Sequence, residues 1–343
     1  MCSINHHSVQ EIIYKHAQST VIVPLIIFIV DCILYSLLFY TILIWNHFLI
    51  YIIASILLGL FTAFLFIVGH DACHQSFTPF RMLNKIIGVI SFLPSLHNFL
   101  LWDLGHNRIH HAYTNLISHD YVYSPLSRQE YNNLSHWNKW KYKLYRSIIG
   151  HALYYGIEIW CKKMIVPRKN VLSKSEYQDK FWTYLQYSAP LLIYMLSTLL
   201  LIIYFINHSV LLFIPKLFFA FLFPFFVFNW IMGFAIFQHH TSPYSRWYAS
   251  KSEWQYWNAQ VMESVHIKFP GWINLLLHNV MEHTAHHCNT KIPLYNLRTA
   301  QADLEKSFAN HVKIVNWNMQ YYWNCMHQCK IYNFEQHKWE KFT

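Results

Sequence analysis

The chain has 343 residues, of which 55% are apolar, 19% are aromatic and only 12% are charged. Because soluble domains carry roughly a quarter charged residues, this composition excludes an ordinary soluble protein and indicates a membrane protein. The formal charge of +10 does not indicate a nucleic-acid partner, since Lys and Arg are scattered among Trp and Tyr and form no dense basic block. Basic residues at a membrane surface explain this charge better.

A helix needs about 20 mainly apolar residues to cross a bilayer. Four segments meet this requirement, and we predict an all-α membrane protein with four transmembrane helices arranged as two hairpins. They cover residues 21–45, 48–69, 181–206 and 210–237. Residues 70–180 and 238–343 are expected to form a cytosolic helical cap. With no repeat or linker visible, we expect a single domain over residues 1–343.

The connections between the spans predict their orientation. The turns near Asn46 and at Asn207–Ser209 contain no Lys or Arg, whereas nearly all basic residues lie in 70–180 and 240–343. By the positive-inside rule, both termini and the long middle region face the cytosol. We therefore expect a multi-pass protein of the bacterial inner membrane or the endoplasmic reticulum.

Two ionisable residues and two shorter apolar segments need separate interpretation. Asp31 lies within the first span without an evident partner, and Lys216 lies near an end of the fourth, where a lysine can reach the interface. Neither is assigned a catalytic role. Residues 84–102 are interrupted at Pro94 and are typical of a re-entrant or interfacial segment, and the pattern of 147–160 predicts a helix on the membrane surface.

Eight of the 24 histidines fall into three tight clusters, and residues three or four apart share one face of a helix. The clusters are His70 and His74; His106, His110 and His111; and His283, His286 and His287. Imidazole is a preferred ligand of iron, copper, zinc and nickel, and eight ligands exceed the capacity of one ion. Since the predicted topology places all three clusters on the cytosolic side, we predict one histidine-rich dimetal site.

Seven widely spaced cysteines indicate no disulfide framework. Cys325 and Cys329 flank His327, which leaves open a minor zinc site, although three ligands fall short of the usual four.

The histidine clusters also carry a family resemblance. The strings HDACH at 70–74, HNRIHH at 106–111 and HTAHH at 283–287 resemble the three histidine boxes of the membrane fatty acid desaturases. Flanking residues such as Trp102 and the string IPLYNL at 292–297 strengthen the match. The resemblance runs from about residue 65 to 305 and is closest to the acyl-lipid branch that includes Δ12 and ω-3 enzymes.

This resemblance implies an oxidoreductase that uses a non-haem diiron centre, with two Fe ions, and O2 to introduce a double bond into a fatty acyl chain. It also implies a further histidine ligand near the end of the fourth span. His239 in the Gln238–His239 element is the choice, and His240 and His278 stay open as alternatives. The implied metal ligands are His70, His74, His106, His110, His111, His239, His283, His286 and His287.

The two electrons must come from a partner, because the chain contains neither a His-Pro-Gly-Gly haem signature nor a G-x-G-x-x-G fingerprint. A ferredoxin or cytochrome b5 type donor is expected. Basic residues could dock such an acidic donor, and contact with anionic lipid headgroups is the alternative. They are Arg128, Lys139, Lys141 and Lys143.

Other functions compete with desaturation. Three residues separate His106 from His110, where many desaturases have two, and this gap keeps open a membrane diiron hydroxylase of alkane, lipid or carotenoid substrates. A metal transporter is disfavoured because its ligands should lie near mid-membrane, whereas these clusters follow the ends of the spans. A structural or receptor role with an incidental zinc site is the remaining alternative.

Overall fold

The computed structural model describes residues 6–117, 119–165, 181–206, 209–262, 265–309 and 312–342 and is mostly helical. The chain forms two compact units. Unit 1 comprises Met1–Ser19, Gly105–Tyr154 and Gly233–Thr343, and unit 2 comprises Thr20–Leu104 and Tyr155–Met232. The expected single domain stays a prediction.

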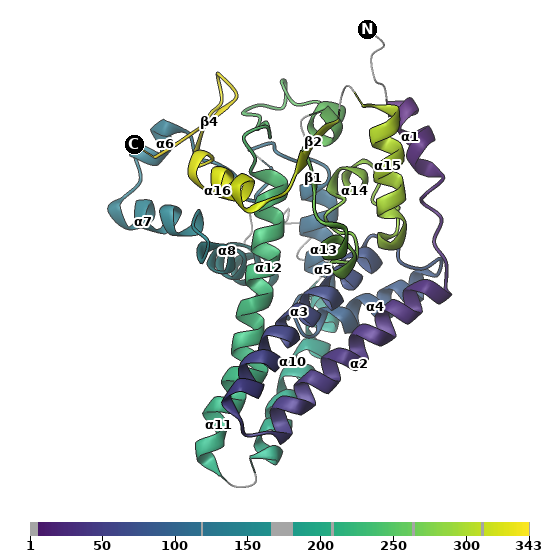
Figure 1. Cartoon of the computed structure of the whole chain (residues 1–343), viewed down its shortest axis with the longest axis vertical. Coiled ribbons are helices and arrows are strands. Elements are labelled where there is room, and N and C mark those ends of the chain that lie inside the picture. Colours follow the sequence, from purple (N-terminus) through teal and green to yellow (C-terminus); the bar gives the residue numbers. More distant parts are fainter. Residues whose placement is uncertain are drawn as a thin grey trace. The chain divides into compact units, whose positions relative to one another are not determined.

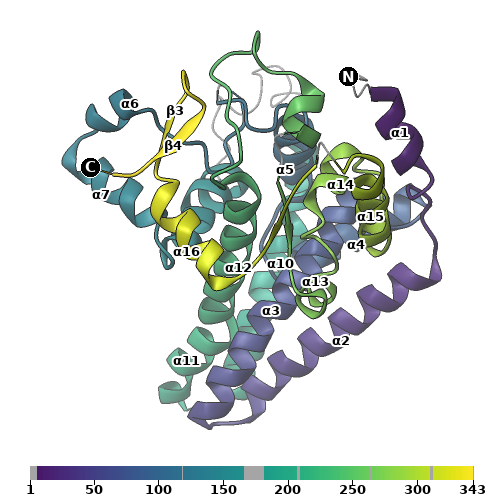
Figure 2. The same ribbon diagram turned by 45° about the horizontal axis from the view of Figure 1, so that its top comes forward.

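Unit 2 contains the long apolar helices. Its elements are α2 (Ile22–Ile44), α3 (Phe48–Cys73), α4 (Arg81–Phe92), α5 (Phe99–Trp102), η2 (Tyr155–Ile165), α10 (Phe181–Phe205), α11 (Val210–Leu217), η3 (Phe218–Leu222) and most of α12 (Phe223–His240). Figures 1 and 2 show α2 and α3 running side by side. Apolar side chains on α2 and α10 are mostly exposed to the surroundings, as expected for helices whose solvent is lipid.

Four helical stretches are long and apolar enough to cross a membrane, which confirms the four helices predicted from the sequence. They are Ile22–Ile44, Phe48–Cys73, Tyr184–Phe205 and Val210–His240. Their hairpin arrangement and orientation stay predictions, and residues 207 and 208 of the predicted turn at 207–209 lie outside the described residues.

Two of these helices extend beyond their apolar segments. The helix α3 continues to Cys73 and therefore carries His70, and α12 continues to His240 and carries both histidines of the fourth span. Gly69 allows the close packing beside His70, because a Cβ there would lie 2.6 Å from the Phe92 ring. Polar residues can thus continue a helix that an apolar segment begins.

Lys216 has a structural role that the sequence interpretation missed. Its side chain is fully buried, and its ammonium donates to the carbonyl oxygens of Leu43 at 2.5 Å, Ile42 at 3.2 Å and Trp45 at 3.4 Å. The last carbonyls of a helix have no partner within it, so Lys216 caps α2. These carbonyls hold the ammonium inside unit 2, and the expectation that Lys216 reaches the membrane interface stays a prediction. Asp31 is also buried.

The two shorter apolar segments also fold as helices. Residues 84–102 form α4 and α5 with a break at Leu93–Asn98, which includes Pro94. In 147–160, Ile149 and Ile157 are exposed whereas His151 and Tyr155 are buried. This exposed apolar side is consistent with a surface helix, and membrane contact of either segment stays a prediction.

Unit 1 is built from short elements that hold the remaining histidines. Its helices are α1 (His6–Tyr14), most of the π-helix η1 (Asp103–His110), α6 (Arg128–Asn132), α7 (His136–Tyr145), α8 (Gly150–Tyr154), the end of α12, η4 (Asn258–Met262), α13 (Gly271–Leu276), α14 (His283–Cys288), η5 (Leu294–Asn296), α15 (Leu297–Ser307) and α16 (Met319–Gln328). Figure 2 shows α14 lying beside α15.

Two small sheets correct the expectation of an all-α protein. Strand β1 (Val265–Lys268) pairs in parallel with β2 (Lys313–Asn316), and β3 (Ile331–Asn333) pairs antiparallel with β4 (Lys338–Glu340). Such three- and four-residue strands satisfy local backbone groups by pairing. They are too short to produce a clear alternating pattern in the sequence.

Replacing Lys216 by Met tests its capping role in α2. The substitution keeps the length of the side chain but leaves buried carbonyls without their donor, so we expect a loss of about 1–3 kcal/mol in stability. Thermal unfolding of the purified chain in detergent measures the effect. The exposed Lys306→Met variant is the control, and equal melting temperatures for the two variants would contradict the capping role.

Candidate metal centre

Four histidines from three separate elements of unit 1 form one group. His110 ends η1, His240 ends α12, and His283 and His287 lie one turn apart on α14. They offer ring nitrogens that all lie within 4.8 Å of one another. We call this set the four-histidine group.

Oxygen atoms around the four-histidine group determine which ring nitrogens point inward. The Nδ1 atom of His110 lies 3.0 Å from Asp120 Oδ1, that of His240 lies 3.1 Å from Asn115 Oδ1, and that of His287 lies 2.7 Å from Gln260 Oε1. Each oxygen accepts a hydrogen bond from the Nδ1–H group, so the Nε2 atom of each neutral ring retains its lone pair. The Nε2 of His287 has no hydrogen-bond partner among the described residues.

The fourth ring, that of His283, contacts the Nε2 atom of His240. The Nε2 atoms of His240 and His283 lie 3.2 Å apart. Burial, followed by the charge of neighbouring imidazoles, lowers the pKa of His283 and His287 well below the usual value. The rings are therefore neutral at physiological pH, which is the form that binds metals. A cation shared by these nitrogens would satisfy them.

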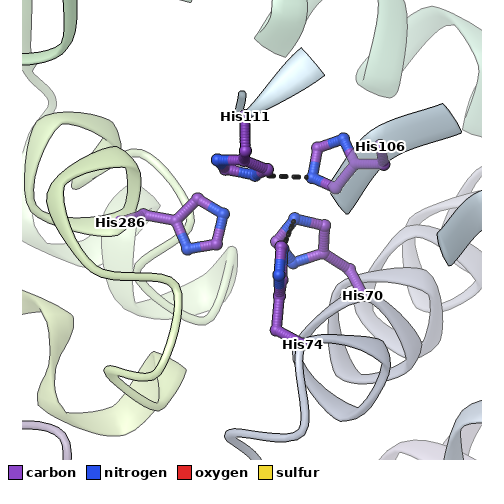
Figure 3. Close-up of side chains that lie close together, drawn as sticks. All are labelled: His70, His74, His106, His111 and His286. Atoms are coloured by element: carbon purple, nitrogen blue, oxygen red, sulfur yellow. Dashed lines mark hydrogen bonds between the residues drawn. The ribbon is translucent and has the colours of Figure 1, made fainter. Parts of the chain in front are cut away.

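A second group in unit 1 is formed by His106, His111 and His286, whose ligand atoms also lie within 4.8 Å of one another. Figure 3 shows these three rings turned toward one another, with the Nε2 atoms of His106 and His111 3.0 Å apart. Burial, together with the charge of His110, lowers the pKa of His286 to about 3. We call this set the three-histidine group.

Unit 2 contributes a pair of histidines from the first cluster. His70 lies in the last turn of α3 and His74 follows that helix directly, and their Nε2 atoms are 3.3 Å apart (Figure 3). Both side chains are buried. The i, i+4 spacing read from the sequence therefore does place the two imidazoles together.

The second cluster reaches its geometry through an unusual helix. Residues Asp103–His110 form a π-helix, and the amide of His111 donates to the carbonyl of His106, five residues earlier. A π-helix holds one more residue per turn than an α-helix. The three-residue gap between His106 and His110 is thus absorbed by the backbone, and His106 still meets His111.

The candidates for the additional histidine occupy different places in the structure, and the choice between them stays a prediction. His240 belongs to the four-histidine group, whereas His239, the choice from the sequence, lies outside both groups within the described residues. Its ring stacks on His283 with the centroids 3.7 Å apart. His278 is also outside both groups. Adjacent residues on a helix point about 100° apart, so only one of His239 and His240 can face the group.

Asp120, Asn115 and Gln260 were not identified from the sequence. Asp120 also accepts from the amides of Asn115 at 2.9 Å and Val122 at 3.0 Å. Asn115 adopts a left-handed φ of 59°, a conformation that asparagine tolerates better than most residues. One feature of the sequence could have identified Asp120 as a partner of the histidines, because it is the sole carboxylate between Asp103 and Glu130. No feature of the sequence distinguishes Gln260 in this way.

A buried charge network supports the start of α14. His266 on β1 contacts Glu282 at 2.8 Å through Nε2 and Glu305 through Nδ1, and Asn274 also donates to Glu282. Burial alone would lower the pKa of His266, but the hydrogen bonds and charges of the two glutamates raise it to about 9. A positive His266 between two carboxylates holds Glu282 in place, directly before His283.

The cysteines do not extend the metal centre. Burial raises the pKa of Cys288 to about 12, so its thiol is neutral. Cys325 and Cys329 are buried, whereas His327 between them is exposed. Within the described part of the chain these three form no candidate metal group.

The donor set fits a transition metal. Both groups of unit 1 consist of imidazole nitrogens alone, and three rings of the four-histidine group have their Nδ1 atoms held by oxygen partners. Neutral nitrogen donors suit iron, zinc or copper rather than magnesium or calcium. Long apolar helices and buried histidine groups define the class of membrane-helix proteins with a histidine-rich metal site.

Comparison with known proteins narrows this class. A sequence model described as fatty acid desaturase matches residues 46–318. The match covers most of the chain, which therefore belongs to the fatty acid desaturase family.

Individual relatives fall within the acyl-lipid branch. A chloroplastic omega-6 fatty acid desaturase of Brassica napus is 24% identical over 291 residues, covering 79% of this chain and 57% of the relative. An sn-1 oleoyl-lipid 12-desaturase of Picosynechococcus is 26% identical over 281 residues, covering 79% and 73%. One of Arthrospira platensis is 29% identical over 235 residues, covering 68% and 62%. The chain spans 57% to 60% of the length of the Brassica and soybean chloroplast relatives.

Replacing Asp120 by Asn tests how the four-histidine group is oriented. The variant retains the shape of the side chain but loses the charge that holds the His110 proton on Nδ1, so we expect metal affinity to fall about 10- to 100-fold. Metal retained per chain during a chelator titration measures this affinity. The exposed Glu335→Gln variant should behave as the unmodified chain, and an Asp120→Asn variant that does the same would refute the proposed orientation.

A pair of alanine variants separates His239 from His240. We expect His240→Ala to lower the amount of metal bound per chain, because it removes a nitrogen of the four-histidine group. His239→Ala should retain the metal content of the unmodified chain, since its ring stacks on His283 outside the group. Elemental analysis of both purified variants gives the counts, and the reverse result would favour His239 as the ligand.

Proposed function

We propose that this protein is a membrane acyl-lipid desaturase with a non-haem diiron centre. Its reaction would remove two hydrogens from adjacent methylenes of an acyl chain while one O2, two electrons and two protons form two water molecules. The observation that carries the proposal is the pair of all-nitrogen groups in unit 1, whose imidazoles form a donor set too large for one ion. Family membership supports the same chemistry.

The ligands divide between two irons in this proposal. The four-histidine group would hold one iron through His110, His240, His283 and His287. The three-histidine group would hold the other, with His70 and His74 completing its ligands as the resemblance to the three histidine boxes implies. His239 stays the alternative to His240. Bound iron supplies the oxidising power that cleavage of an unactivated C–H bond requires, and the protein positions the chain and keeps the histidines neutral.

Iron is favoured over zinc by the number of ligands. A catalytic zinc ion in a hydrolase typically uses three protein ligands and a water molecule, so hydrolysis would not require two groups of imidazoles. Desaturation requires an oxidant and acts on a hydrophobic acyl chain. A redox-active metal in a protein with four long apolar helices meets both requirements.

The names of the relatives suggest the position of the double bond. Proteins similar to this chain are named omega-6 fatty acid desaturase and sn-1 oleoyl-lipid 12-desaturase. We therefore propose an oleoyl chain on a membrane lipid as substrate, with the new double bond at carbon 12.

The proposed arrangement in the membrane follows the charge distribution. The four apolar helices would form two hairpins with both termini in the cytosol, and the histidines would lie at that side. An external ferredoxin or cytochrome b5 type protein would supply electrons. Among the basic residues considered for docking, Arg128 forms an ion pair with Glu340 at 2.7 Å, which leaves the lysines of α7 as the better candidates.

A hydroxylase is the second candidate, because the gap between His106 and His110 is also found in membrane alkane hydroxylases. The π-helix weakens this reading, since it brings His106 and His111 together despite the additional residue. Product analysis separates the two functions.

Expression in a host whose lipids contain oleoyl chains but no diunsaturated chains tests the activity. We expect a new 18-carbon diene with a double bond at carbon 12, detected by mass spectrometry of the derivatised fatty acids, and about two irons per purified chain. His287→Ala should abolish the product, because it removes a nitrogen from the four-histidine group, whereas the exposed His136→Ala variant should retain it. A hydroxylated product would support the second candidate, and a chain that binds zinc alone would refute both.

A further inference from the structure

A cavity in unit 1 lies apart from the histidine groups. It has a volume of about 540 Å³ and lies where α7, the segment after it and α16 come together. We call it the basic pocket and define it by Lys143, Arg146, Ile149, Trp323, Met326 and Lys330.

Three cations line the basic pocket, and no acidic residue does. The guanidinium of Arg146 donates to the carbonyls of Cys329 and Tyr123, each at 3.1 Å, and the ammonium of Lys330 donates to the carbonyl of Arg146 at 2.7 Å. Within the described residues, none of Lys143, Arg146 and Lys330 forms an ion pair with a carboxylate. Among the described residues, the cations of the pocket therefore contact carbonyl oxygens and aromatic rings, including Phe342 against Lys143 and Lys330, but no carboxylate.

The pKa of Lys330 reflects the burial and the like charges of this pocket. Burial, together with the charge of Arg146, lowers the pKa of Lys330 to about 8. Arg146 itself is buried, held between the rings of Tyr142 and Trp339. A buried guanidinium is normally paired, so an anion in the pocket would provide a charge that the protein does not supply.

The rest of the pocket is apolar. Ile149 and Trp323 are 64% and 51% exposed at its edge, and Met326 is buried in it. Large apolar side chains around a cluster of cations match a ligand that carries an anionic head and a hydrocarbon chain. A docking surface for an acidic soluble protein would instead be expected to have a polar, hydrated rim.

We propose that the basic pocket binds the phosphate headgroup of an anionic phospholipid, with the glycerol and first acyl carbons lying along Ile149 and Trp323. Lys143, Arg146 and Lys330 bind the phosphate, and the exposed apolar side chains lie at the level of the upper acyl chains. This binding does not require the metal centre, and the proposal stands independently of the proposed function.

Native mass spectrometry of the purified full chain in detergent, as isolated, tests the proposal, with dioleoyl phosphatidylglycerol and dioleoyl phosphatidylcholine as probes. We expect tighter binding of phosphatidylglycerol. The Lys143→Gln/Lys330→Gln variant should bind it about thirtyfold more weakly, since each basic residue near an anionic lipid contributes roughly a fivefold change. A control variant, Lys251→Gln/Lys306→Gln, removes the same charge from exposed lysines outside the pocket and should bind it as the unmodified chain does.

A second variant guards against misfolding of the first. Ile149→Glu places a carboxylate at an exposed position of the pocket, where no core packing is removed, and should also weaken phosphatidylglycerol binding. Inorganic phosphate at millimolar concentration should not displace the lipid, and displacement would show a free-phosphate site instead.

Two further outcomes would overturn the proposal. One is equal affinity of all variants for phosphatidylglycerol. The other is a Lys143→Gln/Lys330→Gln variant that binds the lipid normally but loses its binding to an acidic ferredoxin, which would identify the pocket as a protein-docking surface.

Discussion

The structure depends on keeping several imidazoles neutral, close together and fixed in orientation inside a low-dielectric interior. Four rings in unit 1 approach so closely that their nitrogens lie within 4.8 Å. Protonation of any of them would place a charge beside its neighbours, and burial opposes that charge further. The carboxylate of Asp120 and the amide oxygens of Asn115 and Gln260 hold the Nδ1 protons, which leaves the Nε2 lone pairs for a shared cation. The surrounding polar residues thus determine which atoms can bind metal.

The same requirement explains how the helices are built. A buried polar group needs a partner, and the structure supplies one at two helix ends. The ammonium of Lys216 caps the carbonyls that end α2, and the charged network of His266 with Glu282 and Glu305 holds the start of α14. The Lys216 contact stabilises the end of α2 within unit 2, and the His266 network stabilises the start of α14, which carries His283 and His287, within unit 1.

The second histidine cluster has three residues between His106 and His110, where many desaturases have two. An additional residue in an α-helix would rotate His106 away from His111. The π-helix of residues 103–110 absorbs it, and the two Nε2 atoms remain 3.0 Å apart. The number of residues between two histidines is therefore a weaker guide to function than the positions of their ring nitrogens. The longer gap between His106 and His110 is compatible with the proposed desaturase function.

The sequence by itself determined the membrane class, the four apolar helices and the histidines of the three clusters, because apolar length and helical spacing are local properties of the chain. Only the tertiary structure showed that His240 rather than His239 joins the four-histidine group, that Lys216 is a cap, and that Asp120 and Gln260 orient the ligands. These contacts join residues from different elements, such as His287 and Gln260, whose distance depends on how the intervening turns fold. The two short sheets escaped prediction for the same reason, since a three- or four-residue strand is stabilised by its distant partner and not by its own pattern.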